Sequence, residues 1–150
     1  MSAANIELQI LLVEDNPSDA ELTLDALRDA GMVNKVQWVK DGAEALDVLF
    51  GSDAKAAAES PRLRLVLLDL RLPRVDGLEV LRAIRADVRT KRLPVTVLTS
   101  SNAESDVVRA YDLGANSYIV KPVEAGSFMH AVKELSCYWM LLNKVPGETT

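Results

Sequence analysis

Short apolar runs alternate along the chain with segments in which apolar residues recur at helical spacing. The apolar runs cover residues 10–13, 36–39, 65–68, 95–98 and 118–120. Short continuous aliphatic runs are typical of parallel strands that are covered on both faces. Segment 17–30, by contrast, spaces Ala20, Leu24 and Leu27 as on one face of a helix. This alternation predicts five β-α units in a doubly wound parallel sheet, which is an α/β fold.

Capping residues indicate the ends of two further helices. One helix is expected after Asp76 and Gly77, where apolar residues again follow at helical spacing. Another is expected near Asn102, which can cap it, and ends at Gly114, which can adopt the conformation of a helix terminus. Segment 51–64 interrupts the alternation, and its alanines, charges and proline predict a longer surface loop.

The composition agrees with this predicted fold and limits the classes of function that the chain can have. The chain has 150 residues, of which 49% are hydrophobic, and this predicts a single domain over residues 1–150 with one core. No apolar run reaches membrane-spanning length, and residues 1–9 lack the pattern of a secretory signal. From the net charge of −5 and the single cysteine, Cys137, we expect a cytoplasmic protein that binds neither nucleic acid nor membrane.

Polar residues follow four of the predicted strands at the point where each strand ends. Glu14 and Asp15 follow the first strand, and Asp69 follows the third. Thr99 follows the fourth strand and Lys121 the fifth. The carboxyl ends of parallel strands meet at one edge of a sheet, where open α/β sheets bind ligands. We therefore expect these side chains to converge although they are far apart in sequence.

Three carboxylates in one crevice repel each other unless they share protons or hold a cation. Oxygen ligands without a converging histidine or cysteine favour a hard divalent ion such as Mg²⁺. With Lys121 as a fixed positive charge and Thr99 as a hydroxyl donor, the set predicts a site for a dianionic phosphoryl group, with Asp69 as the nucleophile. One acid after a strand is usually a helix cap or a solvated residue, but four complementary strand ends are harder to explain that way.

The segments that carry these residues resemble the receiver domains of bacterial response regulators. They read LVED at 12–15, LLDLRLPRVDG at 67–77, VLTSS at 97–101 and GANSYIVKP at 114–122. The resemblance covers residues 9–135 and implies a flavodoxin-like fold with strand order 2-1-3-4-5, followed by a C-terminal helix extension over about 136–145. It also implies a two-component response regulator, a signalling protein and not an enzyme, whose partner is a histidine kinase.

The resemblance assigns a role to the residues around the acceptor. It implies that Asp69 accepts the phosphoryl group from a phosphohistidine of the kinase. Asp15 and Asp69 bind Mg²⁺ together with the backbone carbonyl of Arg71, while Glu14 acts through water, and Mn²⁺ or Ca²⁺ can substitute. Arg71 and Ser101 border the attacking water, so they are expected to influence the lifetime of the phosphate, in a direction that the sequence does not reveal.

The same resemblance describes a switch beside the acceptor. It implies that Thr99 bonds the phosphoryl oxygens, that Lys121 forms an ion pair with them, and that Tyr118 turns inward when Thr99 moves. A side chain drawn to a new charge leaves space that a ring can fill, which makes a two-state element. The bond between Lys121 and Pro122 is expected to be cis.

The last predicted helix carries more apolar surface than its own sheet can cover. A stripe with a seven-residue repeat runs along it, and segment 137–142 is apolar on every side. Such a helix needs cover on both faces, so we expect a homodimer through this helix. The alternative is that segment 51–64 folds over it. The expected interface residues are Tyr138, Trp139, Met140, Leu141 and Leu142.

The tail also narrows the resemblance. A stand-alone receiver with a long segment before its third strand and Tyr138, Trp139, Asn143 and Pro146 near its end is similar to the regulators of bacterial phytochrome-type histidine kinases. This implies a phytochrome-type kinase as the partner. The single histidine, His130, lies in the last helix and is expected at the surface, neither donating phosphate nor binding metal.

Other functions stay open at this point. The chain can be a phosphorelay intermediate or the regulator of a different sensor kinase. A Mg²⁺-dependent phosphohydrolase with an aspartyl nucleophile is a further alternative, although such enzymes usually carry a second acid where this chain has Arg71. A degenerate receiver that serves only as a binding module is disfavoured by the complete set of site residues.

Overall fold

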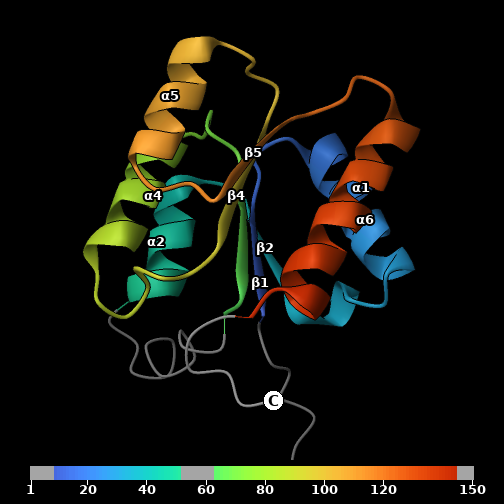
Figure 1. Cartoon of the computed structure of the whole chain (residues 1–150), viewed down its shortest axis with the longest axis horizontal. Helices are drawn as coiled ribbons and strands as arrows, with labels where there is room; N and C mark the ends of the chain where they lie inside the picture. Colours follow the sequence, from blue (N-terminus) through green and yellow to red (C-terminus); the bar gives the residue numbers. More distant parts are fainter. Residues whose placement is uncertain (1–8, 52–62, 145–150) are drawn as a thin grey trace, which may run out of the picture.

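A parallel sheet forms the centre of the computed structural model, which describes residues 9–51 and 63–144 (Figure 1). Its five strands lie in the order β2-β1-β3-β4-β5. They are β1 (Ile10–Val13), β2 (Val36–Val39), β3 (Leu65–Leu68), β4 (Val95–Thr99) and β5 (Ser117–Val120). The predicted fold class and strand order are confirmed, and β4 and β5 are each one residue longer than the predicted runs.

Helices cover both faces of this sheet. The helices α2, α4 and α5 lie on one face, and α1 and α6 lie on the other (Figure 1). They are α1 (Pro17–Asp29), α2 (Gly42–Phe50), α4 (Gly77–Ala86), α5 (Glu104–Asp112) and α6 (Ala125–Cys137), with a 3₁₀ turn η1 (Val33–Lys35) before β2 and a π-helical turn η3 (Tyr138–Leu142) after α6. The doubly wound arrangement predicted from the alternating pattern is therefore present.

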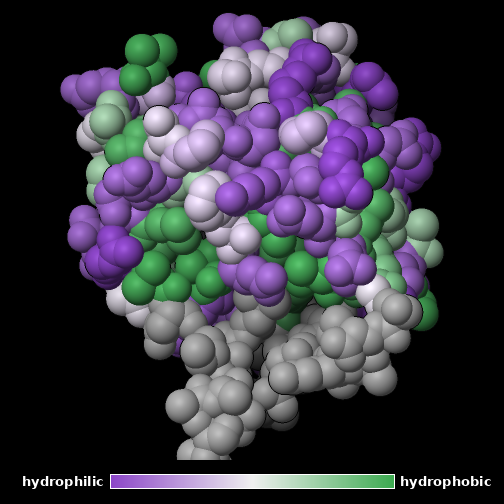
Figure 2. Space-filling view, turned by 180° about the vertical axis from the view of Figure 1, so that it is seen from behind, coloured by the Kyte–Doolittle hydropathy of each residue, from purple (hydrophilic) through white to green (hydrophobic). Residues whose placement is uncertain are grey.

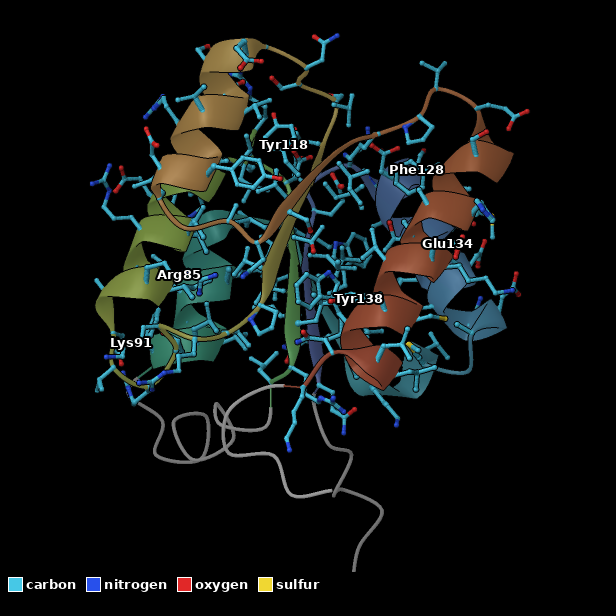
Figure 3. All side chains as sticks on the ribbon, in the orientation of Figure 1. Arg85, Lys91, Tyr118, Phe128, Glu134 and Tyr138 are labelled. Carbon is cyan, nitrogen blue, oxygen red and sulfur yellow. The ribbon has the colours of Figure 1, made fainter. Side chains whose placement is uncertain are left out.

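The central strands bury both of their faces, which explains why their apolar runs are continuous. Leu11 and Val13 of β1 lie in the core beneath α2, α4 and α5, whereas Ile10 and Leu12 lie in the core beneath α1 and α6. Phe128 of α6 packs into this second core and points toward the sheet (Figure 3). Each fully buried side chain of this size stabilises the fold by about 1.5–3 kcal/mol.

The observed start of α1 agrees with the sequence pattern, whereas the start of α5 differs from the predicted one. The Asn16 side chain caps α1 by accepting from the amide of Asp19 at 3.0 Å. At α5 the N-cap is Ala103, which makes no side-chain hydrogen bond, so the predicted cap at Asn102 is wrong. The helix starts one residue too late for Asn102 to reach its free amides. Gly114 has φ of +103°, as expected at the end of this helix.

The peptide bond between Lys121 and Pro122 is trans, as is every other peptide bond among the described residues. The expectation of a cis bond is therefore wrong. For a bond before proline the two isomers differ by only about 0.5–1 kcal/mol, so the surroundings and not the dipeptide decide between them.

Arg85 of α4 joins that helix to the connections around β4 and β5. Its guanidinium donates to the carbonyls of Leu93 and Gly114 at 2.7 and 2.9 Å and to Asn116 Oδ1 at 2.8 Å. Figure 3 shows the side chain extending from α4. Partial burial lowers the pKa of this arginine from its usual value. The network thus ties α4 to the segments that lead into β4 and β5.

The last helix ends in a π-helical turn that leaves apolar side chains at the surface. In η3, Tyr138 is 48%, Leu141 71% and Leu142 77% exposed, while Trp139 is half-buried. Met140 is only 6% exposed and lies in the core beneath α1 and α6, so its assignment to a partner surface is corrected. Trp139 packs against the same core, so the outward part of this turn consists of Tyr138, Leu141 and Leu142.

Seen from behind, the molecule is mostly hydrophilic, and hydrophobic residues gather in the lower half of that face (Figure 2). Within residues 9–51 and 63–144, no helix has the length and apolarity that a membrane span requires. The predicted surface loop at 51–64 and the end of the predicted helix extension at 145 lie largely or wholly outside the described residues.

Candidate functional site

The polar residues predicted at the strand ends meet at one edge of the sheet. Glu14 follows β1, Asp69 follows β3 and Lys121 follows β5. The Lys121 ammonium lies 2.8 Å from Glu14 Oε1 and 3.0 Å from Asp69 Oδ2. The sheet order brings these residues together because β1 and β3 are neighbours and β5 is two strands away from β3. The predicted convergence of these three residues is present in the structure.

The acidic residues form a cluster with the geometry of a cation site. Glu14, Asp15 and Asp69 each offer a carboxylate oxygen, and these oxygens lie within 4.8 Å of one another. Glu14 and Asp69 are buried, whereas Asp15 is exposed. Burial, together with repulsion from Asp69, raises the pKa of Glu14 to about 7. Negative charge on all three carboxylates is therefore unfavourable. A divalent cation, which prefers oxygen ligands, would offset this repulsion.

Lys121 is held by a third carboxylate that the sequence did not indicate. Asp19 Oδ2 accepts from the same ammonium at 2.8 Å. Burial lowers the pKa of Lys121, but this effect is outweighed by its hydrogen bonds to Asp19 and Glu14 and by the charge of Asp69. The pKa of Lys121 therefore lies above its usual value. The lysine is therefore a fixed cation. Asp19 stands in the first turn of α1, where an acid is ordinarily explained by the helix dipole alone.

The loop after β3 is held tightly around Asp69. The Asp69 amide donates to Val13 O at 3.1 Å, which continues the pairing of β3 with β1 by one residue. The loop then folds back, and the Gly77 amide donates to Leu70 O at 2.9 Å. A Cβ at Gly77 would overlap the backbone carbonyl oxygen of Asp69. Glycine is therefore required where α4 begins, and it allows α4 to lie directly against the acceptor residue.

Thr99 and Tyr118 lie on neighbouring strands beside the acid cluster. Thr99 is fully buried, and its hydroxyl oxygen accepts from the Ser101 amide at a long 3.4 Å. The Tyr118 hydroxyl donates to the Ser101 carbonyl at 2.8 Å. The half-buried ring lies between the sheet and α5 (Figure 3). Burial raises the pKa of this tyrosine. Ser101 therefore connects the threonine and the tyrosine through its backbone.

A second network lies beside the first and includes another residue that the sequence did not indicate. Asp106 of α5 accepts from Arg71 Nη2 at 2.8 Å and from the Ser101 hydroxyl at 2.5 Å. The hydrogen bond from Ser101, followed by the charge of Arg71, lowers the pKa of Asp106. Arg71 and Ser101, expected separately beside the attacking water, are thus joined by one carboxylate.

Trp38 supplies a further contact beside the acid cluster. Its indole Nε1 donates to the backbone carbonyl of Glu14 at 2.8 Å. The ring thereby fixes the backbone just beyond β1, where the two adjacent acids begin. His130, as expected, lies at the surface, 75% exposed and 3.5 Å from Glu134.

Comparison with known proteins shows the family to which this arrangement belongs. The chain matches the family model of the response regulator receiver domain over residues 10–133. It is 42% identical to the probable methanogenesis regulatory protein FilR2 of Methanothrix harundinacea, over 92% of this chain and 87% of that one. It is 36% identical to the response regulator Rcp1 of Synechocystis, over 92% of each chain.

Solved structures of relatives have the same fold. The phosphorylated cyanobacterial phytochrome response regulator RcpA superposes with a TM-score of 0.83 at 36% identity, over 94% of this chain and 99% of that one. The Mn²⁺-bound form of Rcp1 gives 0.82 at 35% identity, over 92% and 98%. The bacteriophytochrome response regulator RtBRR gives 0.70 at 47% identity, over 93% and 84%. With an acidic cluster and a buried lysine at the carboxyl edge of a 2-1-3-4-5 sheet, the chain belongs to the response regulator receiver domains, the phosphoryl-accepting signalling modules of two-component systems.

Proposed function

We propose that Asp69 accepts a phosphoryl group from the phosphohistidine of a histidine kinase and that its new charge changes the protein-binding surface. The observation that carries this proposal is Lys121, whose ammonium lies between Asp69 and Glu14 at 3.0 and 2.8 Å. A buried cation favours the negative charge that a phosphoryl group brings. In the transfer, a carboxylate oxygen of Asp69 attacks phosphorus, and the P–N bond breaks with its electron pair left on the imidazole.

The acid cluster is proposed to hold Mg²⁺, with Mn²⁺ or Ca²⁺ as substitutes. The side chains of Glu14, Asp15 and Asp69 would take part, together with the carbonyl of Arg71. When bound, the ion supplies positive charge to the phosphoryl oxygens. The raised pKa of Glu14 supports this assignment, because it reflects a buried acid beside Asp69. A relative, Rcp1, was solved in a Mn²⁺-bound form.

The switch is proposed to run from Thr99 to Tyr118. Thr99 is buried behind the acceptor edge, and Ser101 is bonded to both residues. If the Thr99 hydroxyl turns to a phosphoryl oxygen, it gives up its weak bond to the Ser101 amide. The backbone of Ser101 can then shift, and the hydroxyl of Tyr118 follows it. The result is a change at α5 and β5, where a partner protein can bind.

We further infer that the kinase is of the phytochrome type. RcpA and RtBRR are described as phytochrome and bacteriophytochrome response regulators, and both match more than nine-tenths of this chain. Because kinase phosphorylation consumes ATP, we expect the protein to work in the cytoplasm. The alternatives are that the chain is a phosphorelay intermediate or that it serves a different sensor kinase. Purified kinases of each type, labelled with radioactive ATP, distinguish these possibilities by the rate at which they transfer phosphate to the chain.

A homodimer through the end of α6 belongs to the same proposal. Leu141 and Leu142 project from η3 with 71% and 77% exposure, and Tyr138 is 48% exposed. Adjacent exposed apolar side chains indicate a surface that another protein covers. A second copy of the chain presents the same surface, so a two-fold contact is the simplest arrangement.

The central test is phosphorylation without a kinase. The chain is incubated with Mg²⁺ and acetyl phosphate, and its intact mass is measured. Wild type is expected to gain one phosphoryl group, and Asp69→Asn none. Asp76→Asn is the matched control, because Asp76 is an exposed acid at the end of the same loop and makes no capping bond.

Three results would contradict the proposal in different ways. An adduct that persists in Asp69→Asn would place the acceptor elsewhere. Rapid turnover of small phosphoesters would indicate a phosphohydrolase, and no adduct in wild type would indicate a module that only binds.

A further inference from the structure

Asp106 joins the acceptor loop to helix α5. It stands in the first turn of α5 and is only 9% exposed. A single oxygen, Oδ2, accepts from Arg71 Nη2 at 2.8 Å and from Ser101 Oγ at 2.5 Å. The two donors come from the loops after β3 and β4, two residues beyond Asp69 and Thr99. The carboxylate thus connects α5 with both sides of the site.

Arg71 lies within reach of two different anions. Its backbone amide is 3.4 Å from Asp69 Oδ1, so its side chain starts next to the acceptor carboxylate. Its guanidinium is nevertheless turned to Asp106. The Arg71 side chain is 70% exposed, and it can therefore change direction without breaking a packed core. Within the described part of the chain, Asp106 is the one side chain that the Arg71 guanidinium contacts by a hydrogen bond or ion pair.

We propose that Asp106 is a positioning residue that competes with a phosphoryl group on Asp69 for the guanidinium of Arg71. The inference rests on the proposed function of Asp69. Without phosphate, Asp106 is the better placed anion and holds Arg71 against α5. An aspartyl phosphate carries roughly two negative charges and several strong hydrogen-bond acceptors. It would place them on the side of Arg71 where the backbone amide already faces Asp69. Guanidinium pairs with phosphate oxygens in a bidentate manner, so Arg71 moves to the new anion.

The exchange links phosphorylation to α5. When Arg71 leaves, Asp106 keeps the hydrogen bond from the Ser101 hydroxyl and the nearby charge of Arg109. Ser101 is also the residue to which Tyr118 donates at 2.8 Å. The first turn of α5 therefore loses its ion pair when Asp69 gains charge. In the phosphorylated state Arg71 covers the phosphoryl oxygens and hinders the attacking water. Asp106, by drawing Arg71 away, shortens the lifetime of the phosphate.

A double-mutant cycle tests this competition. Wild type, Asp106→Asn, Arg71→Ala and the double variant are phosphorylated with acetyl phosphate and Mg²⁺, and the loss of the adduct is followed by intact mass. Asp106→Asn keeps the shape and a hydrogen-bond acceptor but removes the charge. It is expected to slow the loss about three- to fivefold, as the exchange of one partly exposed ion pair allows. In the Arg71→Ala background the same substitution is expected to change nothing.

Asp112→Asn is the matched control, because Asp112 is an exposed aspartate at the other end of α5. It should lose the adduct at the wild-type rate. Unchanged or faster loss in Asp106→Asn would overturn the inference, and so would an equal effect with and without Arg71, which would show a merely structural role. Absence of any adduct in wild type contradicts the proposed function of Asp69 instead, so the two failures are distinguishable.

Discussion

Lys121 and Asp69 are joined across 52 residues of sequence, with the lysine ammonium donating to Asp69 Oδ2 at 3.0 Å. The same ammonium also meets Glu14 and Asp19, each at 2.8 Å. One buried ammonium thus forms ion pairs with three carboxylates, and two of these, Glu14 and Asp69, also belong to the acid cluster. Any divalent ion or phosphoryl group that enters the site must share these oxygens with Lys121 or displace it from them.

Replacing Lys121 by glutamine is expected to tighten Mg²⁺ binding about tenfold, which corresponds to about 1.4 kcal/mol. The ammonium repels a second cation and occupies oxygens of Glu14 and Asp69, so its removal frees ligands for the metal. Trp38 bonds the Glu14 carbonyl at 2.8 Å, and its fluorescence provides the readout for a Mg²⁺ titration.

Lys133→Gln serves as the control for this titration, because Lys133 is exposed on α6. It should bind Mg²⁺ with wild-type affinity. Equal or weaker binding by Lys121→Gln would show that the lysine and the metal do not share ligands.

Asp19→Asn is expected to lower the free energy of unfolding by about 1 kcal/mol. The substitution removes one charged partner of Lys121, whose side chain is only 7% exposed, whereas that of Asp19 is 28% exposed. Urea denaturation measures the effect. Glu21→Gln, on the exposed side of the same helix, should stay within about 0.5 kcal/mol of wild type. If both variants are equally stable, Asp19 contributes nothing to holding the lysine.

Gly77→Ala is expected to destabilise the fold by about 1–3 kcal/mol, the usual cost of forcing an extra carbon into a packed place. The new Cβ would overlap the carbonyl oxygen of Asp69, which is backbone and cannot swing aside. We therefore expect a lower midpoint of unfolding and slower phosphorylation by acetyl phosphate.

Gly126→Ala makes the same chemical change near the start of α6. There the nearest atom to the new Cβ is, at 3.2 Å, the Glu124 carboxylate oxygen that caps α6, and this side chain can shift by a few tenths of an ångström where backbone cannot. Because alanine favours helix more than glycine does, this variant should be as stable as wild type or more so. A Gly77→Ala variant of equal stability would mean that α4 can move away from the acceptor loop at no cost.

Leu142→Glu is expected to convert the proposed dimer to a monomer. Leu142 is 77% exposed, so a charge there does not disturb the protein's own core, but it is costly within an apolar interface. Sedimentation velocity at micromolar concentrations measures the change. Val88→Glu alters another exposed apolar residue, 75% exposed and far from η3 in sequence, and should leave the dimer intact. A wild-type chain that sediments as a monomer would exclude the dimer altogether.

The order of apolar and polar residues was enough to predict the sheet, the helices around it and the residues at the strand ends. Leu11 and Leu12 are adjacent and both apolar because they enter different cores, so the unbroken pattern already required a sheet covered on two faces. Parallel strands present all their carboxyl ends at one edge, which is why Glu14, Asp69 and Lys121 were predicted to meet although no local signal connects them.

The other charged residues of the site could be identified only from the folded chain. Asp19 and Asp106 both stand in the first turn of a helix, where any acid is favoured by the helix dipole, so their sequence positions carry no sign of Lys121 or Arg71. Met140, predicted to face a partner, lies instead in the core beneath α1 and α6, because its cover depends on how α6 packs on the sheet. These features depend on distances between elements, which local pattern does not contain.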